Sequence, residues 1–154
     1  MTDFTIRDAH GGDLPAVVAL LRQDQMGGED EDPGPPLDPG YRAAFDAIAG
    51  DPNQFLFVGE QDGRVVGTFQ LSLLPGLLYH GAWRGQIEAV RIDERVRGRG
   101  LGEAMMKLAL DLCRARGCRI VQLTSNTART RAHAFYERLG FTKSHVGMKL
   151  MLEP

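Results

Sequence analysis

The stretch that decides the fold reads Gln86-Ile87-Glu88-Ala89-Val90-Arg91-Ile92 and, after a gap of four residues, Arg97-Gly98-Arg99-Gly100-Leu101-Gly102. Its β-branched and aliphatic residues predict a strand from Gly85 to Ile92. The apolar residues that follow recur at helical spacing and predict a helix from Gly100 to Arg116, which Gly117 ends. The sequence therefore predicts a strand that leads into a glycine-rich helix start.

A glycine-rich helix start forms a cradle for an anion. Glycine lets the backbone approach a ligand closely, the first amides of a helix have no partner within it, and the helix dipole adds partial positive charge. Arg97 and Arg99 reinforce that charge. The run lacks the Gly-Lys-Ser/Thr ending of an ATP-binding loop, and its third glycine is out of place for a dinucleotide fingerprint. A pyrophosphate is thus the expected ligand, whereas ATP and NAD are disfavoured.

Toward the amino end, strand and helix signals alternate. Strands are expected at residues 4–7, 55–60 and 64–74, and helices at residues 13–22 and 39–49. The turn Asp62-Gly63 joins the second and third of these strands as a hairpin. Residues 23–40 contain four prolines and the acidic run Glu29-Asp30-Glu31-Asp32. This composition predicts a mobile acidic surface loop rich in Gly and Pro.

Toward the carboxyl end, the sequence predicts a strand at residues 119–124 and a helix that Gly140 ends. Final strands from Phe141 to Leu152 are expected to complete the sheet. The order strand, two helices, three strands, helix, strand, helix, strand predicts a mixed α/β fold of the α+β kind. At 154 residues, the whole chain, 1–154, is expected to form one domain.

Composition excludes several classes of protein. Apolar residues make up 43% and charged residues 25%, which is typical of a globular chain, and no apolar run approaches the length of about 20 residues that spans a membrane. The net charge of −2 argues against nucleic acid as a partner. Cys113 and Cys118 have no spacing that indicates a metal site or a disulfide framework. With no signal-peptide pattern at the amino end, a cytoplasmic location is expected.

Two motifs resemble those of the GNAT superfamily of N-acetyltransferases. Arg97, Gly100 and Gly102 fit its signature, Arg/Gln-x-x-Gly-x-Gly/Ala after the fourth strand, and the run from Ala134 to Phe141 resembles its Tyr-Glu-x-x-Gly-Phe element. The resemblance implies a twisted, mostly antiparallel sheet of about six to seven strands with about four helices. It also implies that strands 4 and 5 splay apart to admit the pantetheine arm of acetyl-CoA.

The resemblance also implies which residues bind that cofactor. Backbone groups of the strand would pair with the pantetheine arm, and amides of the helix start would hold the pyrophosphate. The residues concerned are Val90, Arg91, Ile92, Arg97, Gly98, Arg99, Gly100, Leu101 and Gly102. Asn126 is polar and close enough to the fifth strand to contact the cofactor. The family's frequent Asn lies seven residues before the tyrosine, where this chain has Arg129.

Two residues are candidates for catalysis. Tyr136 resembles the family's general acid, although it also belongs to an apolar helix stripe that packs in an ordinary core. Glu88 resembles the glutamate of the Gly-His-x-Glu-Asp strand in glucosamine-6-phosphate N-acetyltransferases, and it would accept a proton from the amine or bind its ammonium form. The alternative is an exposed carboxylate without a role. His80 and His133 are read as ordinary surface or capping residues.

The resemblance thus implies an acetyl-CoA-dependent acyltransferase that acts without a metal on a primary amine of a small molecule, by direct attack in a ternary complex. If the acidic run 29–32 folds over the acceptor, it favours a cationic one. Relatives pair through their last strands, which implies a homodimer. The alternatives are an acyl-CoA-binding regulatory module, acetylation of a protein or peptide amine, and an arginine-rich nucleic-acid surface, which the net charge disfavours. No membrane partner is expected.

Overall fold

The fold centres on one five-stranded sheet. The computed structural model describes residues 3–24 and 28–154. The strands are β1 (Thr5–Asp8), β2 (Gln54–Gln61), β3 (Arg64–Leu74), β4 (Trp83–Ile92) and β5 (Cys118–Leu123), and they lie in this order across the sheet. The first four strands are antiparallel neighbours, and β4 and β5 run parallel. This arrangement confirms the predicted mixed, mostly antiparallel sheet.

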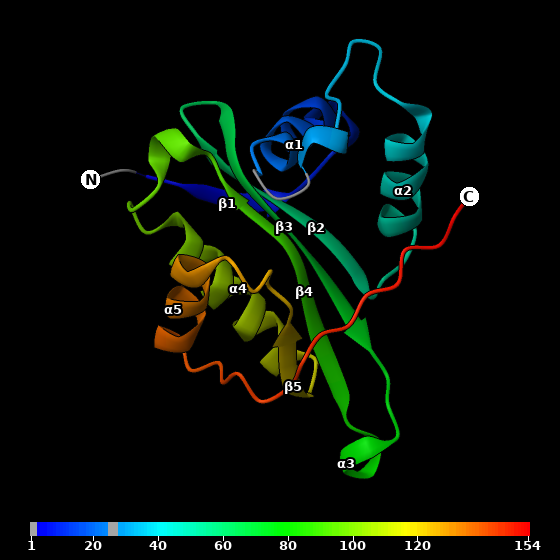
Figure 1. The fold of residues 1–154 in the computed structure, drawn as a ribbon, viewed down its shortest axis with the longest axis vertical. Coiled ribbons are helices and arrows are strands. Elements are labelled where there is room, and N and C mark those ends of the chain that lie inside the picture. The colour runs from blue at the N-terminus through cyan, green and yellow to red at the C-terminus, as the bar shows by residue number, and fades with distance from the viewer. Residues whose placement is uncertain (1–2, 25–27) are drawn as a thin grey trace.

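Helices cover both faces of the sheet. The main helices are α1 (Leu14–Arg22), α2 (Pro39–Ala49), α4 (Leu101–Ala115) and α5 (Thr130–Arg138). Shorter turns are η1 (Gly11–Asp13), η2 (Gly28–Asp30), α3 (Leu78–Gly81) and η3 (Glu94–Val96). Figure 1 shows α1 and α2 on one face, with α4 and α5 on the other. The four expected helices are therefore present.

The largest part of the core lies between α4 and the sheet. Phe69, Leu71 and Ile87 from the strands pack with buried residues of α4, among them Met105. Leu101, the first residue of α4, is only 1% exposed because two glycines of the sheet make room for it. A Cβ atom at Gly59 or Gly67 would lie 2.9 or 2.8 Å from a Leu101 methyl group. This close approach fixes the start of α4 against the sheet.

The pairing between the parallel strands β4 and β5 ends halfway along β4. Their pairing runs from Trp83 opposite Cys118 to Ile87 opposite Leu123, where β5 ends. Strand β4 continues to Ile92, and there the described residues pair with it only from β3. The expected splay between strands 4 and 5 is therefore confirmed, and it opens toward the start of α4 (Figure 1).

The predicted final strands are wrong for the described chain. Residues 141–154 form neither helix nor strand. Their alternating apolar side chains, which suggested strands, remain 82–90% exposed in Val146, Met148, Leu150 and Leu152. A strand needs a neighbour for its backbone groups, and none of the described strands pairs with this tail, although Phe141 packs on Tyr136 and Gly147 lies beside Thr124. The sheet therefore has five described strands instead of six to seven.

The acidic stretch 23–40 is partly ordered by contacts to α2. The phenol of Tyr41 donates a hydrogen bond of 2.5 Å to Glu31 and accepts one of 3.2 Å from the amide of Asp32. Residues 25–27 of the predicted loop lie outside the described residues. Mobility of the stretch, like the single domain spanning 1–154, stays a prediction.

Candidate active site

A bulge bends β4 where the splay begins. The register of β3 against β4 shifts between Thr68, which lies opposite Arg91, and Gln70, which lies opposite Glu88. Ala89, between these two partners on β4, takes a positive φ of 52°. Beyond the bulge, Val90 and Ile92 turn their side chains onto the core. Their backbone edge on the β5 side then faces the splay, because β5 has already ended. This edge is available to the amides of an extended ligand.

The helix start that follows β4 is open. Residues 97–100 are exposed, and Gly100 caps α4 with a φ of 89°, a left-handed conformation that favours glycine. The space beside Gly98 and Gly100 holds no other atom within 4 Å of an added Cβ. The Arg97 side chain donates to the carbonyl of Ile92 at 3.3 Å, which ties the loop to β4. First-turn amides, the helix dipole and open space together suit an anionic ligand.

Tyr136 lies on α5 in an aromatic cluster. Its ring makes edge contacts with Phe135 and Phe141, at centroid distances of 5.2 and 5.9 Å. Burial raises the pKa of the phenol, and the positive charges of Arg91 and Arg129 oppose that rise. The phenol is therefore protonated at neutral pH, as a proton donor must be. Tyr136 can pack in the core and still act as an acid, because the ring makes the packing contacts and the hydroxyl group carries the proton.

Glu88 is exposed on β4, opposite Gln70 of β3. Because neighbouring residues of a strand point to opposite faces, its carboxylate lies on the face away from the buried Ile87. Among the described residues no hydrogen bond or ion pair engages this carboxylate. It is thus accessible to a substrate amine, and its role stays a prediction.

An ionic cluster that the sequence did not predict lies beside Tyr136. Asp24, just after α1, forms an ion pair with Arg91 at 2.8 Å and a second one with Arg129. Arg91 also donates to the carbonyl of Val90 at 2.8 Å. Burial lowers the pKa of Arg91, and the nearby charge of Arg129 lowers it further. The cluster joins α1, β4 and the start of α5, three segments that only the fold brings together.

Asn126 shapes the turn that leads into α5. Its side-chain oxygen accepts a hydrogen bond of 2.9 Å from the amide of Ala128, and its carbonyl accepts one of 2.8 Å from the ring of His133. The predicted contact between Asn126 and a cofactor stays a prediction. This hydrogen bond from His133 ties the turn to the first part of α5.

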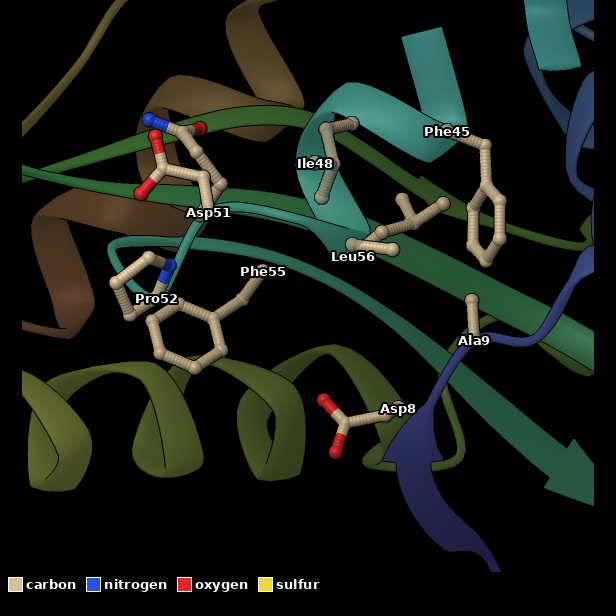
Figure 2. Close-up of a pocket in the computed structure, with 10 residues that line it drawn as sticks. Asp8, Ala9, Phe45, Ile48, Asp51, Pro52, Phe55 and Leu56 are labelled. Atoms are coloured by element: carbon tan, nitrogen blue, oxygen red, sulfur yellow. The ribbon is translucent and has the colours of Figure 1, made fainter. Parts of the chain in front are cut away.

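Two hollows lie elsewhere on the molecule. A cavity of about 310 Å³ lies between α2 and β2, lined by apolar residues such as Phe45 and Phe55 and flanked by Asp8 and Asp51 (Figure 2). A second hollow of about 730 Å³ lies between the acidic stretch and Tyr41. Within the described residues, no group of three or more His, Cys, Asp or Glu side chains could hold a metal ion. Neither hollow is lined by the free edge of β4 or by the start of α4.

The mixed sheet, whose parallel strands part beside a glycine-rich helix start, belongs to a chain of the acyltransferase class. The chain belongs to the acetyltransferase (GNAT) family, whose model matches residues 17–141. The predicted membership of this family and the predicted enzyme class are both confirmed.

Relatives of this chain are named as N-acetyltransferases. The aminoalkylphosphonate N-acetyltransferase of Salmonella typhimurium is 31% identical over 105 residues, which cover 68% of this chain and 68% of that protein. A glucosamine 6-phosphate N-acetyltransferase of Trypanosoma brucei brucei is 35% identical over 97 residues, or 63% of this chain and 64% of the relative. Such relatives support acetyl transfer to amines as the activity.

One solved structure is especially similar. The crystal structure of a transcriptional regulator from Bacillus halodurans C-125 matches with a TM-score of 0.95 and 39% identity. The match covers 97% of this chain and 100% of that one. The fold described here is therefore shared along nearly its full length.

Proposed function

We propose that this chain transfers an acetyl group from acetyl-CoA to the primary amine of a small molecule, by direct attack in a ternary complex. The observation that carries the proposal is the free edge of β4 beyond Ile87, which leads directly to the open start of α4. Both halves of acetyl-CoA find suitable partners there: an extended chain of amides beside a strand edge, and phosphates at a helix start.

The residues present fit this cosubstrate. Val90, Arg91 and Ile92 present the strand edge, and the exposed run 97–100 with the first amides of α4 surrounds open space. Bound acetyl-CoA supplies a thioester, from which the acetyl group is taken and a thiolate leaves. Arg97 and Arg99 add positive charge beside the phosphates. The metal-free reaction expected from the sequence remains part of the proposal.

Two side chains would move the protons of the reaction. Glu88 would take the proton of the attacking amine, directly or through one water, or hold its ammonium form before attack. Tyr136 would give its phenolic proton to the departing thiolate, and burial keeps that proton in place at neutral pH. The carbon–nitrogen bond forms as the carbon–sulfur bond breaks, so the two proton transfers balance the charge.

The acceptor is proposed to be a small amine, cationic before it reacts. Two relatives are named for aminoalkylphosphonate and for glucosamine 6-phosphate, both small amines. The acidic hollow around Asp30, Asp32 and Asp38 adds negative potential that attracts an ammonium group. A protein or peptide amine remains the alternative acceptor.

Thiol release measures this function directly. Wild-type protein with acetyl-CoA and a panel of primary amines is expected to release CoA in proportion to N-acetylated product, with kcat of about 1 per second or more for a good acceptor. A panel of small amines, amino sugars and peptides separates the acceptor classes. Acyl-CoA binding without release for any of them would contradict the catalytic proposal.

A second candidate is a regulatory module that binds acyl-CoA without turnover. The observation that favours it is the name of the similar Bacillus halodurans structure, a transcriptional regulator. The same assay separates the two functions, because a sensor binds CoA species and acetylates no amine.

The expected surroundings of the protein are also proposals. A cytoplasmic location is supported by Cys113 and Cys118, which are both free thiols. Among the described helices, none has the length and apolar character needed to cross a bilayer. A homodimer is supported by the exposed apolar residues of the tail from Val146 to Leu152, which a second copy would cover. Sedimentation of the wild type against Leu150→Lys tests the dimer, because a lysine there should yield monomers.

A further inference from the structure

We propose that Arg91 and Arg129 together bind an anionic group of the acceptor amine, a phosphonate or a phosphate, and that Asp24 fills this place as an internal counter-ion. The inference rests on the proposed function and deepens it by naming the acceptor class. It describes an acceptor that carries an amine at one end and an anion at the other.

The first support is the convergence of two guanidinium groups on one carboxylate. One oxygen of Asp24 lies 2.8 Å from Arg91, and its other oxygen pairs with Arg129. All three side chains are largely shielded, with 10% exposure for Asp24, 23% for Arg91 and 26% for Arg129. Two arginines around a pair of carboxylate oxygens reproduce the way proteins hold carboxylate and phosphate ligands.

The second support is an imbalance of charge and of hydrogen bonds. The charged and titratable groups that act most strongly on Arg91 are Arg129, Asp24 and the phenol of Tyr136. With the phenol neutral, two cations share one carboxylate. The Nε atom of Arg91 is buried and has no hydrogen-bond partner among the described residues. An anion with three oxygens would supply acceptors that the two oxygens of Asp24 do not.

The third support is position. Arg91 donates to the carbonyl of Val90, within the strand edge at the splay. Both arginines also act electrostatically on Tyr136. An anion held by this pair is therefore anchored close to the proposed acid, and its amine end can extend from there toward the acetyl group.

Isothermal titration of the full chain tests the inference in two steps. CoA is titrated first, and methylphosphonate is then titrated at saturating CoA, so that the helix start is already filled. Wild-type protein is expected to bind methylphosphonate under these conditions. Arg129→Gln should weaken that binding by at least about tenfold while CoA affinity is retained. Arg114→Gln, which removes an exposed arginine of α4, serves as the matched control and should bind as wild type.

The variant Asp24→Asn tests the counter-ion separately. Removing the carboxylate leaves two unpaired cations, so methylphosphonate should bind at least about tenfold more tightly than to wild type. It should also raise the melting temperature of this variant more than that of wild type, a readout that works even if the variant is less stable. Weaker binding by Asp24→Asn would overturn the counter-ion role.

Three results would overturn the anion site. They are unchanged binding in Arg129→Gln, no binding of methylphosphonate to wild type at saturating CoA, and mutual exclusion of methylphosphonate and CoA. The last result would assign the arginines to the phosphates of the cofactor. A failure of CoA itself to bind in the first step is a different outcome, because it contradicts the proposed function.

Discussion

The side chain of Tyr136 has an apolar environment around its ring and a charged environment around its hydroxyl group. Its ring packs against Phe135 and Phe141, while the positive charges of Arg91 and Arg129 act on its hydroxyl group. Burial raises the pKa of the phenol, so the proton is present at neutral pH, and the charges of Arg91 and Arg129 would stabilise the phenolate that remains once the proton passes to a departing thiolate.

Removing this hydroxyl group should affect chemistry alone. Tyr136→Phe keeps the ring contacts, so the melting temperature and the dissociation constant of CoA should stay close to those of wild type. Loss of the proton donor should lower kcat by about 100-fold or more. Steady-state thiol release beside a CoA titration checks both expectations. A variant with unchanged kcat would leave Tyr136 as a packing residue.

Glu88 has two proposed roles that kinetics can separate. If the carboxylate takes a proton in the transition state, Glu88→Gln lowers kcat by about 100-fold with little change in KM. If it binds the ammonium group instead, KM rises and kcat holds. The exposed and unpaired Glu94 of η3 provides the matched control, since Glu94→Gln should change neither constant. Wild-type kinetics for Glu88→Gln would show that the carboxylate has no part in the reaction.

The spacing of residues in the sequence predicted the glycine-rich helix start of the candidate site. It did not predict the ion pairs of Asp24 with Arg91 and Arg129. The glycines and arginines from Arg97 to Gly102 follow a local pattern that needs no knowledge of the fold. Asp24 and Arg129 are far apart in the chain, and each looks like an ordinary surface charge until the fold brings them together. The one available signal was Arg129 standing where the family usually has Asn.

At the scale of elements, the start of α4 is positioned by the sheet beneath it. Leu101 sits over Gly59 and Gly67, where a Cβ would lie less than 3 Å from its methyl groups. The start of α4 can therefore lie beside β4 because Gly59 and Gly67 have no side chains. The local sequence pattern predicted the helix. Its position against the sheet depends on packing between residues that are distant in the sequence.

Gly67→Ala should displace the start of α4 from its position on the sheet. The added methyl group would displace Leu101 and overpack the core, which lowers the free energy of unfolding by about 1–3 kcal/mol. Because the first amides of α4 move with Leu101, CoA binding should weaken by about tenfold. Urea unfolding and a CoA titration measure the two effects. Gly76→Ala is the control, since its Cβ would meet only the flexible end of Arg84 and the carbonyl of Ala82.

The carboxyl-terminal segment shows why pattern alone predicts a strand but not its formation. Residues 146, 148, 150 and 152 alternate as a strand requires, yet they are over 80% exposed. Alternating apolar and polar residues indicate that one face of a strand should be buried. They do not indicate which surface would bury it. In one copy of this chain, the described residues offer these side chains no such surface, so five strands form in the sheet.

At the scale of the whole molecule, an ion-pair network around the buried carboxylate of Asp13 joins η1 to the strands β1 and β2. Arg7 of β1 donates to Asp13 at 2.8 Å and to Glu60 of β2 at 2.8 Å, and Asp13 is 6% exposed. Arg7 holds the pKa of Asp13 below its ordinary value. A lowered carboxyl pKa stabilises the fold above the ordinary value of about 4, and that contribution is lost as pH falls through the folded-state pKa.

Asp13→Asn should remove this pH-dependent part of the stability. At pH 7 the free energy of unfolding should fall by about 2 kcal/mol, because a charged hydrogen bond to a buried group is lost. The difference between variant and wild type should shrink below about pH 4. Urea unfolding at several pH values gives both numbers. Asp111→Asn, at an exposed ion pair on α4 where water screens the charges, should show much smaller effects. A constant difference between Asp13→Asn and wild type at every pH would contradict the assignment.

The proposed function requires that the splay of β4 from β5 and the glycine-rich start of α4 together bind acetyl-CoA. Thermal unfolding of the full chain with acetyl-CoA, free CoA, ATP and NAD tests it most directly, because a ligand that binds only the folded state raises the melting temperature. We expect stabilisation by acetyl-CoA and CoA and none by NAD or ATP. No stabilisation by either CoA species, or equal stabilisation by all four, would contradict it.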